Sequence, residues 1–139
     1  MKLLLDTHIF LWYISGDPHL PGLVKDAIQD TANQVFLSVA SVWEAVIKYA
    51  LGKLPLPGPP AEYMPRQRQA HQIESLPITE DVMGHLSGLP PLHRDPFDRI
   101  LIATALQHAM TLASVDEVVR QYPVPLLPPI PQSVPPPKE

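Results

Sequence analysis

Four acidic residues stand where the sequence changes from one kind of segment to another, and they are the side chains best placed to do chemistry. Asp6 directly follows a short apolar run, Asp116 closely follows another, and Glu44 and Asp98 lie inside or at the start of apolar helical stretches. Carboxylates gathered at one place repel one another unless a cation lies between them, and Mg²⁺ and Mn²⁺ take oxygen ligands. Water on such an ion becomes a hydroxide-like nucleophile. The pattern therefore suits hydrolysis of a phosphodiester bond.

Each acid also has an ordinary structural interpretation. Asp6 and Asp116 could simply cap the helices that follow them. Because proline favours the first position of a helix, the run Asp95-Pro-Phe-Asp98 makes Asp95 an N-cap and places Asp98 in the first turn, at capping-box spacing. Asp95 is thereby explained as a cap, whereas Asp98 also projects from the helix start, where a metal could be held.

Glu44 has an alternative of its own. Lys48 follows four residues later, and a surface ion pair at that spacing is worth about 0.2–0.5 kcal/mol. If Val39, Val42 and Val46 face the core, Glu44 projects from the edge of that face towards the strand ends. Both interpretations stay open from the sequence.

Short apolar runs alternate with helical patterns along the chain, which indicates an α/β fold with a mostly parallel sheet of four to five strands. Strands are expected at 2–5, 35–38, 73–78, 111–115 and, less clearly, 124–126; helices are expected at 8–14, 21–31, 41–51, 61–71, from 79 onward and at 96–109, with the proline-rich stretch 55–65 breaking regular structure. Ligands of open α/β sheets bind at the carboxyl ends of the strands. Asp6 and Asp116 both fall at that edge if their strands are parallel.

Composition limits the other possibilities. The chain has 139 residues, 45% of them apolar, and no cysteine, so it fits one domain without disulfides, a thiol nucleophile or cysteine-bound zinc. A net charge of −4 argues against tight non-specific binding of nucleic acid. No apolar run is long enough for a membrane span or a signal peptide, so we expect a soluble, cytoplasmic protein. The domain should cover residues 1–127, and the proline-rich tail 128–139 should be extended or disordered.

Taken together in order, four sequence blocks resemble the PIN domain family, and in particular the VapC-type toxins of bacterial toxin–antitoxin pairs. The resemblance runs from Met1 to about Leu127. It rests on Leu-Leu-Leu-Asp-Thr-His (residues 3–8), Ser-Val-Trp-Glu-Ala (41–45) with Lys48 and Gly-Lys-Leu (52–54), His-Arg-Asp-Pro-Phe-Asp-Arg-Ile-Leu-Ile-Ala-Thr-Ala (93–105), and Leu-Ala-Ser-Val-Asp (112–116) before Tyr122.

That resemblance implies a three-layer α/β/α sandwich and a magnesium- or manganese-dependent endoribonuclease. It also implies an RNA substrate, a small antitoxin as partner and a homodimer, with no membrane association. Asp6, Asp98 and Asp116 would hold the metal, while Glu44 would complete the metal's shell or orient the attacking water. Supporting residues would be Thr7, Ser114 and Asp95, and candidate phosphate contacts are His93, Arg94 and Arg99, unless these three form only a solvated loop and helix face.

Other functions remain open at this point. A housekeeping nuclease of RNA maturation has the same sequence features as a toxin, and a catalytically silent PIN-like protein-binding module is a non-enzymatic alternative. A magnesium-dependent phosphatase ranks last because it needs aspartate at position 8, where this chain has His8. Apolar side chains at Ile9, Trp12 and Tyr13 suggest more apolar surface than a monomer needs, which would suit a homodimer.

Overall fold

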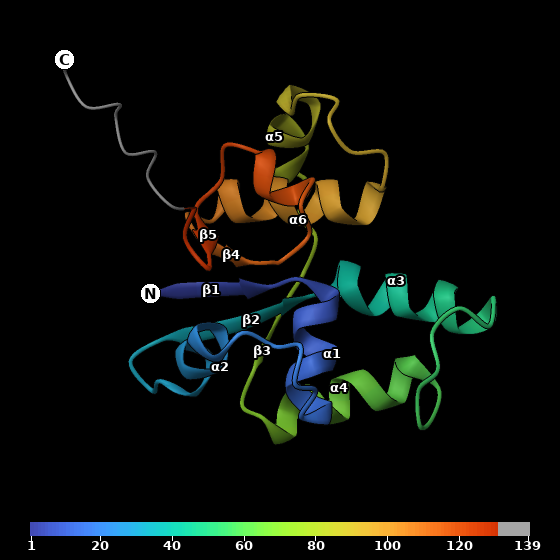
Figure 1. Cartoon of the computed structure of the whole chain (residues 1–139). Coiled ribbons are helices and arrows are strands. Elements are labelled where there is room, and N and C mark those ends of the chain that lie inside the picture. The colour runs from blue at the N-terminus through green and yellow to red at the C-terminus, as the bar shows by residue number, and fades with distance from the viewer. Residues whose placement is uncertain (131–139) are drawn as a thin grey trace, which may run out of the picture.

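The structure is a computed structural model that describes residues 1–130, and a five-stranded parallel sheet runs through its centre (Figure 1). The strand order is β3-β2-β1-β4-β5, and every neighbouring pair is parallel. The strands are β1 (Lys2–Leu5), β2 (Gln34–Ser38), β3 (Glu74–Leu76), β4 (Thr111–Ala113) and β5 (Leu126–Leu127). The predicted parallel α/β sheet is confirmed.

Helices cover both faces of the sheet and complete three layers. They are α1 (Thr7–Ser15), α2 (Gly22–Gln29), α3 (Val39–Ala50), α4 (Pro60–Ala70), α5 (Val82–Gly88), α6 (Pro96–Gln107) and the short 3₁₀ helix η1 (Val119–Gln121). Helices α1, α2 and α4 pack on one face, and α5, α6 and η1 pack on the other (Figure 1). The three-layer sandwich that the resemblance implies is therefore present.

The central strand β1 shows why the chain folds this way. Its three leucines are fully buried; Leu3 and Leu5 join the core beneath α1 and α2, whereas Leu4 joins the core beneath α6. Alternate residues of a strand point to opposite faces, so a strand covered on both faces must be apolar throughout.

The chain order of the strands reverses between β1 and β4. From β1 the chain moves outward through β2 to β3, and it then returns to the other side of β1 to form β4 and β5. Such a switch point leaves a crevice at the carboxyl ends of its two strands, where ligands bind in open α/β sheets. Asp6 directly follows one of these strands, and Asp116 follows the other.

The expected boundaries of the fifth strand and of helices α2 and α4 are wrong. The fifth strand lies at Leu126–Leu127, later than expected, and Pro21 precedes α2 as its cap. Helix α4 already begins at Pro60 and contains Pro65, so the proline-rich stretch does not break regular structure throughout. Proline is well tolerated at the first position of a helix, because the missing N–H has no helical partner there, which accounts for Pro60 but not for Pro65 inside the helix.

The surface differs from expectation in where apolar side chains are exposed. Ile9 is fully buried and Trp12 and Tyr13 are partly buried, so the expected apolar surface on α1 is wrong; α1 packs on the sheet and uses those residues for the core. Exposed apolar side chains lie instead along one side of α3, where Val39, Trp43, Val46 and Ile47 are 38–55% exposed.

Two further expectations concern membrane spans and the carboxyl-terminal tail. Within residues 1–130, no helix is long and apolar enough to cross a bilayer. The expectation of an extended or disordered tail falls mostly on residues 131–139, which lie outside the described residues.

Candidate active site

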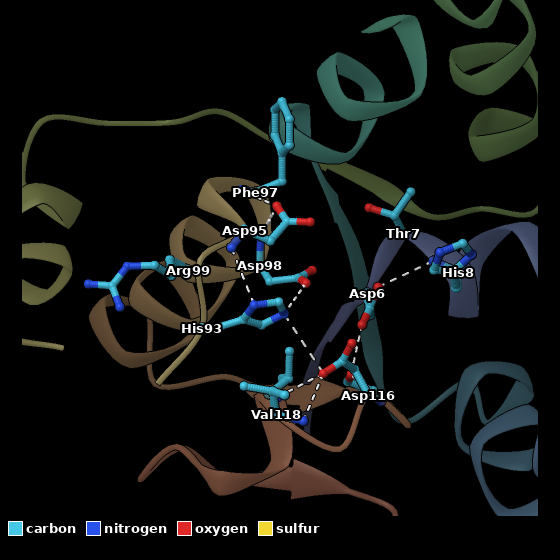
Figure 2. A network of polar contacts seen from close by, with 12 residues as sticks. Asp6, Thr7, His8, His93, Asp95, Phe97, Asp98, Arg99, Asp116 and Val118 are labelled. Carbon is cyan, nitrogen blue, oxygen red and sulfur yellow. Dashed lines mark hydrogen bonds and ion pairs between the residues drawn. The ribbon is translucent and has the colours of Figure 1, made fainter. Parts of the chain in front are cut away.

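The residues at the carboxyl edge of the sheet form one network of polar contacts (Figure 2). Asp6 caps α1, because its Oδ1 accepts a hydrogen bond from the His8 N–H at 3.2 Å. Its other oxygen, Oδ2, accepts from the Ser114 hydroxyl at 2.7 Å, which joins the ends of β1 and β4. Both oxygens are thus held, and the side chain is buried.

Asp98 enters the site from the start of α6. Asp95 caps this helix by accepting from the N–H groups of Phe97 and Asp98 at 2.9 and 3.4 Å. The Asp98 carboxylate lies 2.8 Å from His93 Nε2, which places it towards the other acids and away from the cap. The predicted cap at Asp95 is present, whereas the role of Asp98 as a metal ligand stays a prediction.

His93 lies among the acids. Its Nε2 is 2.8 Å from Asp98 Oδ2 and 3.9 Å from Asp116 Oδ1. His93, Asp98 and Asp116 each offer one ligand atom, and these atoms lie within 4.8 Å of one another; Asp6 is not part of this group. The backbone N–H of Asp95 donates to His93 Nδ1 at 3.3 Å, so the neutral ring carries its hydrogen on Nε2. That nitrogen is buried and makes no hydrogen bond of good geometry with the described residues. In this tautomer His93 can donate a hydrogen bond through Nε2, but it cannot ligate a metal through that nitrogen.

Asp116 both caps a helix and faces the other acids. Its Oδ1 accepts from the N–H groups of Val118 and Val119 at 2.9 and 3.0 Å, at the start of η1. Its own N–H donates to the Ser114 hydroxyl at 3.2 Å, so Ser114 contacts both Asp6 and Asp116. The capping interpretation of Asp116 and its place in the acidic cluster are therefore compatible.

Glu44 is buried inside the site, which corrects the expectation of a surface ion pair. It is 3% exposed, its Oε1 accepts from the Thr7 hydroxyl at 2.7 Å, and its Oε2 pairs with Lys48. The Thr7 hydroxyl also lies 2.9 Å from that of Ser41.

The side of α3 that faces the core also differs from expectation. Its buried residues are Ala40, Ser41, Glu44 and Ala45, whereas Val39 and Val46 are exposed. Helix α3 contacts both α1 and α6, and small side chains permit a close approach between helices. Val39 and Val46 therefore point outward, Val42 packs against the core as expected, and Glu44 points inward.

Burial and crowding change the protonation of the cluster. The pKa of Asp98 is raised to about 8, first by burial and then by the neighbouring carboxylates of Asp6, Asp95, Glu44 and Asp116. Burial also raises the pKa of Asp6, against the hydrogen bonds from Ser114 and His8. Burial alone would lower the pKa of Lys48, but its hydrogen bond to Glu44 and the nearby acids raise it. A bound cation would relieve this repulsion, and oxygen donors of this kind fit Mg²⁺ or Mn²⁺.

The three candidate phosphate contacts differ in whether their side chains point towards the acids. Of the three candidate phosphate contacts, His93 points into the cluster, and Arg94 is exposed beside it. The Arg99 guanidinium points away from the acids; its Nη1 donates to the Pro90 carbonyl at 3.0 Å and to the Tyr122 hydroxyl at 3.1 Å.

Two supporting residues were missed by the sequence analysis in these roles. Ser41 contacts Thr7, and its position three residues before Glu44 on one helix face could have indicated it. The Tyr122 hydroxyl accepts from the His93 N–H at 2.9 Å and from Arg99, linking the segment after η1 to the loop before α6. Contacts 23 and 29 residues apart leave no local signal in a sequence.

Comparison with known proteins identifies the family of this chain. The PIN domain family model matches residues 3–125. Ribonuclease VapC16 of Mycobacterium tuberculosis is 48% identical over 83 residues, a match that covers 52% of this chain and 59% of that relative, so less than two thirds of the relative is spanned. Ribonuclease VapC22 of the same organism is 25% identical over 120 residues, covering 86% of this chain and 90% of the relative.

A solved structure shows the same fold at low sequence identity. VapBC2 from Rickettsia felis, bound to a DNA fragment from its promoter, superposes with a TM-score of 0.68 at 15% identity, covering 91% of this chain and 97% of that chain. At this identity the likeness establishes the fold alone.

Proposed function

This chain belongs to the PIN domain family, and from that premise we propose that it is a metal-dependent endoribonuclease, the toxin of a toxin–antitoxin pair. One observation carries the proposal: carboxylates from four separate segments gather at the switch point of the sheet, where burial first and then their mutual repulsion raise the pKa of Asp98 to about 8. Such crowding is unfavourable unless the site binds a cation. The names of the two ribonuclease relatives support RNA as the substrate.

The proposed metal ligands are Asp6, Asp98 and Asp116, with Mg²⁺ or Mn²⁺ as the ion. A bound ion of this kind lowers the pKa of water and stabilises charge on phosphate oxygens. In the hydrolysis, a water oxygen forms a bond to phosphorus, and the bond to the leaving ribose oxygen breaks. Glu44 completes the metal's shell or orients the attacking water.

Other residues of this chain hold those acids in place. Thr7 and Lys48 occupy the two oxygens of Glu44, and Ser114 donates to Asp6, so neither buried carboxylate can rotate freely. Asp95 fixes the His93 ring through its backbone N–H and fixes the start of α6 through its side chain. Preorganisation of this kind lets charged groups act without rearrangement during the reaction.

His93 is our candidate for a direct phosphate contact, with its Nε2–H as donor, and Arg94 lies exposed next to it. Arg99 acts through the Tyr122 hydroxyl and the Pro90 carbonyl, which positions the loop that carries His93. In the proposal Arg99 is therefore a positioning residue and no longer a candidate phosphate contact.

We also propose a small antitoxin and a second copy of this chain as partners. The exposed apolar side chains of α3 support such an assembly, since a contiguous exposed apolar patch marks an interaction surface. A hollow of about 470 Å³ beside them is lined largely by apolar residues of α3, α5 and α6. Action on cellular RNA places the protein in the cytoplasm within this proposal.

The test is cleavage of total RNA by the purified chain with Mg²⁺, with Mn²⁺ and with EDTA, beside Asp98→Asn and Asp6→Asn. We expect metal-dependent cleavage by the unaltered chain and a decrease of at least about a hundredfold in either variant, because each removes a charge at the metal. Circular dichroism spectra and melting curves check that the variants fold.

Two outcomes would contradict the proposal. Cleavage by either variant at the unaltered rate would refute the assigned ligands. Absence of cleavage by well-folded, antitoxin-free protein with both metals would favour a PIN-like protein-binding module.

A further inference from the structure

A small hollow opens directly beside the catalytic acids, on the side of α1. It measures about 240 Å³ and is lined by Asp6, His8, Ile9, Trp12, Val115 and Asp116. Two of these residues are proposed metal ligands, and the rest present mostly ring and aliphatic surface. Whatever fills this hollow lies next to the bond that the enzyme would cut.

The largest flat surface in the hollow is the indole ring of Trp12. Trp12 lies on α1 one turn after His8, and the ring is partly buried against the core, which restricts its orientation. The imidazoles of His8 and His19 lie near it, with ring centroids 6.3 and 5.7 Å away. A second hollow of about 370 Å³ shares His8 and Trp12 and continues towards Leu54 and Tyr63. Trp12 therefore lines both hollows, and the first of them includes two of the acids.

The charges near the acids leave little for a phosphate backbone to bind. Lys48 pairs with Glu44, Arg99 points away towards Tyr122, and Arg120 donates to the Ser114 carbonyl. Arg94, exposed next to His93, is left to contact a phosphate. The whole chain carries a net charge of −4. Phosphate contacts usually dominate the affinity of nucleic-acid binders, so a chain with so few free cations at its site needs another source of affinity.

Aromatic stacking supplies affinity without charge. Proteins that bind single-stranded RNA stack unpaired bases on aromatic side chains, and every base offers a flat face. A nucleotide whose phosphate lies among Asp6, Asp98 and Asp116 has its base only one sugar away. The hollow that shares Asp6 and Asp116 lies within that reach.

We propose that Trp12 is the stacking platform for an unpaired base adjacent to the scissile phosphate of the RNA substrate. This inference rests on the proposed ribonuclease function and adds a base-binding subsite to it. A base inside a duplex is already stacked on its neighbours and is not free to enter. The subsite therefore selects single-stranded RNA.

Fluorescence tests the binding without requiring cleavage. The chain has two tryptophans, so Trp43→Phe leaves Trp12 as the sole reporter and Trp12→Phe leaves Trp43. Each protein is titrated in Ca²⁺, so that the carboxylates keep a cation, with a short single-stranded RNA and with an abasic sugar-phosphate chain of equal length. We expect RNA to quench Trp12 and leave Trp43 unchanged, and we expect the abasic chain to quench neither.

Kinetics in Mn²⁺ test the consequence for the reaction. Trp12→Leu should raise KM for single-stranded RNA roughly 5- to 100-fold, the range expected for the loss of one stacked base, and Trp12→Phe should restore most of the affinity. Tyr13→Leu is the matched control, because Tyr13 is the next residue of α1 and lines a different hollow at the other edge of the sheet. Its KM should stay within about twofold of the unaltered value.

The outcomes separate this inference from the proposed function. Quenching of Trp12 equally by RNA and by the abasic chain, or by neither, overturns the stacking site even if cleavage is intact. Quenching of Trp12 by RNA alone supports the site even if no metal restores cleavage. A Trp12→Leu protein that changes from dimer to monomer in sedimentation, with no RNA-specific quenching, would assign the hollow to a chain–chain interface and overturn the proposal.

Discussion

Helix α1 has a hollow near each end, and the two hollows contain similar residues but differ in their surroundings. The first lies at the carboxyl edge of the sheet and contains Trp12 with Asp6 and Asp116. The second, about 310 Å³, lies at the amino edge, where Tyr13 packs edge-on against His71 at 5.3 Å and Asp30 lines the wall. Each has an aromatic ring from α1, a histidine nearby and an acid. The types of residue alone do not distinguish them.

The difference is the direction of the helices that meet each hollow. At the carboxyl edge, Asp6, Asp98 and Asp116 lie at the starts of α1, α6 and η1, where free N–H groups and the positive end of the helix dipole stabilise anions. At the amino edge, Tyr13, Gln29 and His71 lie at the ends of α1, α2 and α4, where unpaired carbonyl groups disfavour anions. Because α1, α6 and η1 start at the carboxyl edge of the sheet, whereas α1, α2 and α4 end at the amino edge, the carboxyl edge is the better place to bind anionic groups.

Stabilisation by a bound metal ion should differ most between the two hollows. Mn²⁺ at about 100 times its dissociation constant should raise the free energy of unfolding by about 2.7 kcal/mol, because it binds the folded site alone. Asp98→Asn should lose most of this gain, whereas Asp30→Asn, the matched acid of the amino-edge hollow, should keep it. Thermal unfolding followed by circular dichroism, with and without Mn²⁺, measures the difference. An equal gain in Asp98→Asn would mean that the ion binds elsewhere and that the carboxyl edge is not the metal site.

A smaller effect is expected from the hydroxyl that holds Glu44. Thr7→Val leaves a buried carboxylate oxygen and the Ser41 hydroxyl without their partner, which should cost about 1–3 kcal/mol of stability. The control is Thr31→Val, because Thr31 is exposed and lines the amino-edge hollow; it should change stability by less than about 0.5 kcal/mol. Urea unfolding curves of the two variants give both values. Similar losses in the two would show that the Glu44 network adds no special stability.

The smallest expected effect is a dependence of metal-free stability on pH. The pKa of Asp98 is about 8 in the folded protein and 3.8 in its usual environment, so between these values the folded protein holds a proton that the unfolded chain releases. The free energy of unfolding should therefore rise as the pH falls from about 8 towards 5, by on the order of 1 kcal/mol after solvent screening. Burial raises the pKa of Asp6 and acts in the same direction.

Urea unfolding in EDTA at pH 8 and at pH 5.5 measures this dependence. Asp98→Asn should flatten it, because asparagine does not titrate, and Asp30→Asn should leave it unchanged. A stability that instead falls on acidification over this range, and does so equally in Asp98→Asn, would show that the acids of the carboxyl edge are not crowded as described.

Much of the fold could be predicted because its signals are local. The leucines of β1, the cap at Asp95 and the alternation of strands with helices each occupy a few neighbouring residues. The carboxyl ends of parallel strands share an edge, so placing Asp6 and Asp116 after two strands was enough to predict that they lie close together.

The environment of Glu44 could not be predicted in the same way. The spacing to Lys48 correctly indicated their pairing, but the burial of the pair depends on how closely α3 approaches its neighbours. The side of α3 that faces the core was assigned to the valines, because apolar side chains usually point inward. In this protein the small residues take that position, and Val39 and Val46 are left exposed.

The sequence by itself determined which acids are available, which strands precede them and at which edge of the sheet they must meet. Only the tertiary structure decided how each acid is held, because the bonds that do so join distant residues: Ser114 to Asp6 across 108 positions and Thr7 to Glu44 across 37. It also directed His93 into the cluster, turned Arg99 away and placed the Trp12 ring beside Asp6. Local patterns set the backbone of each segment, whereas the direction and protonation of a side chain depend on what other segments bring next to it.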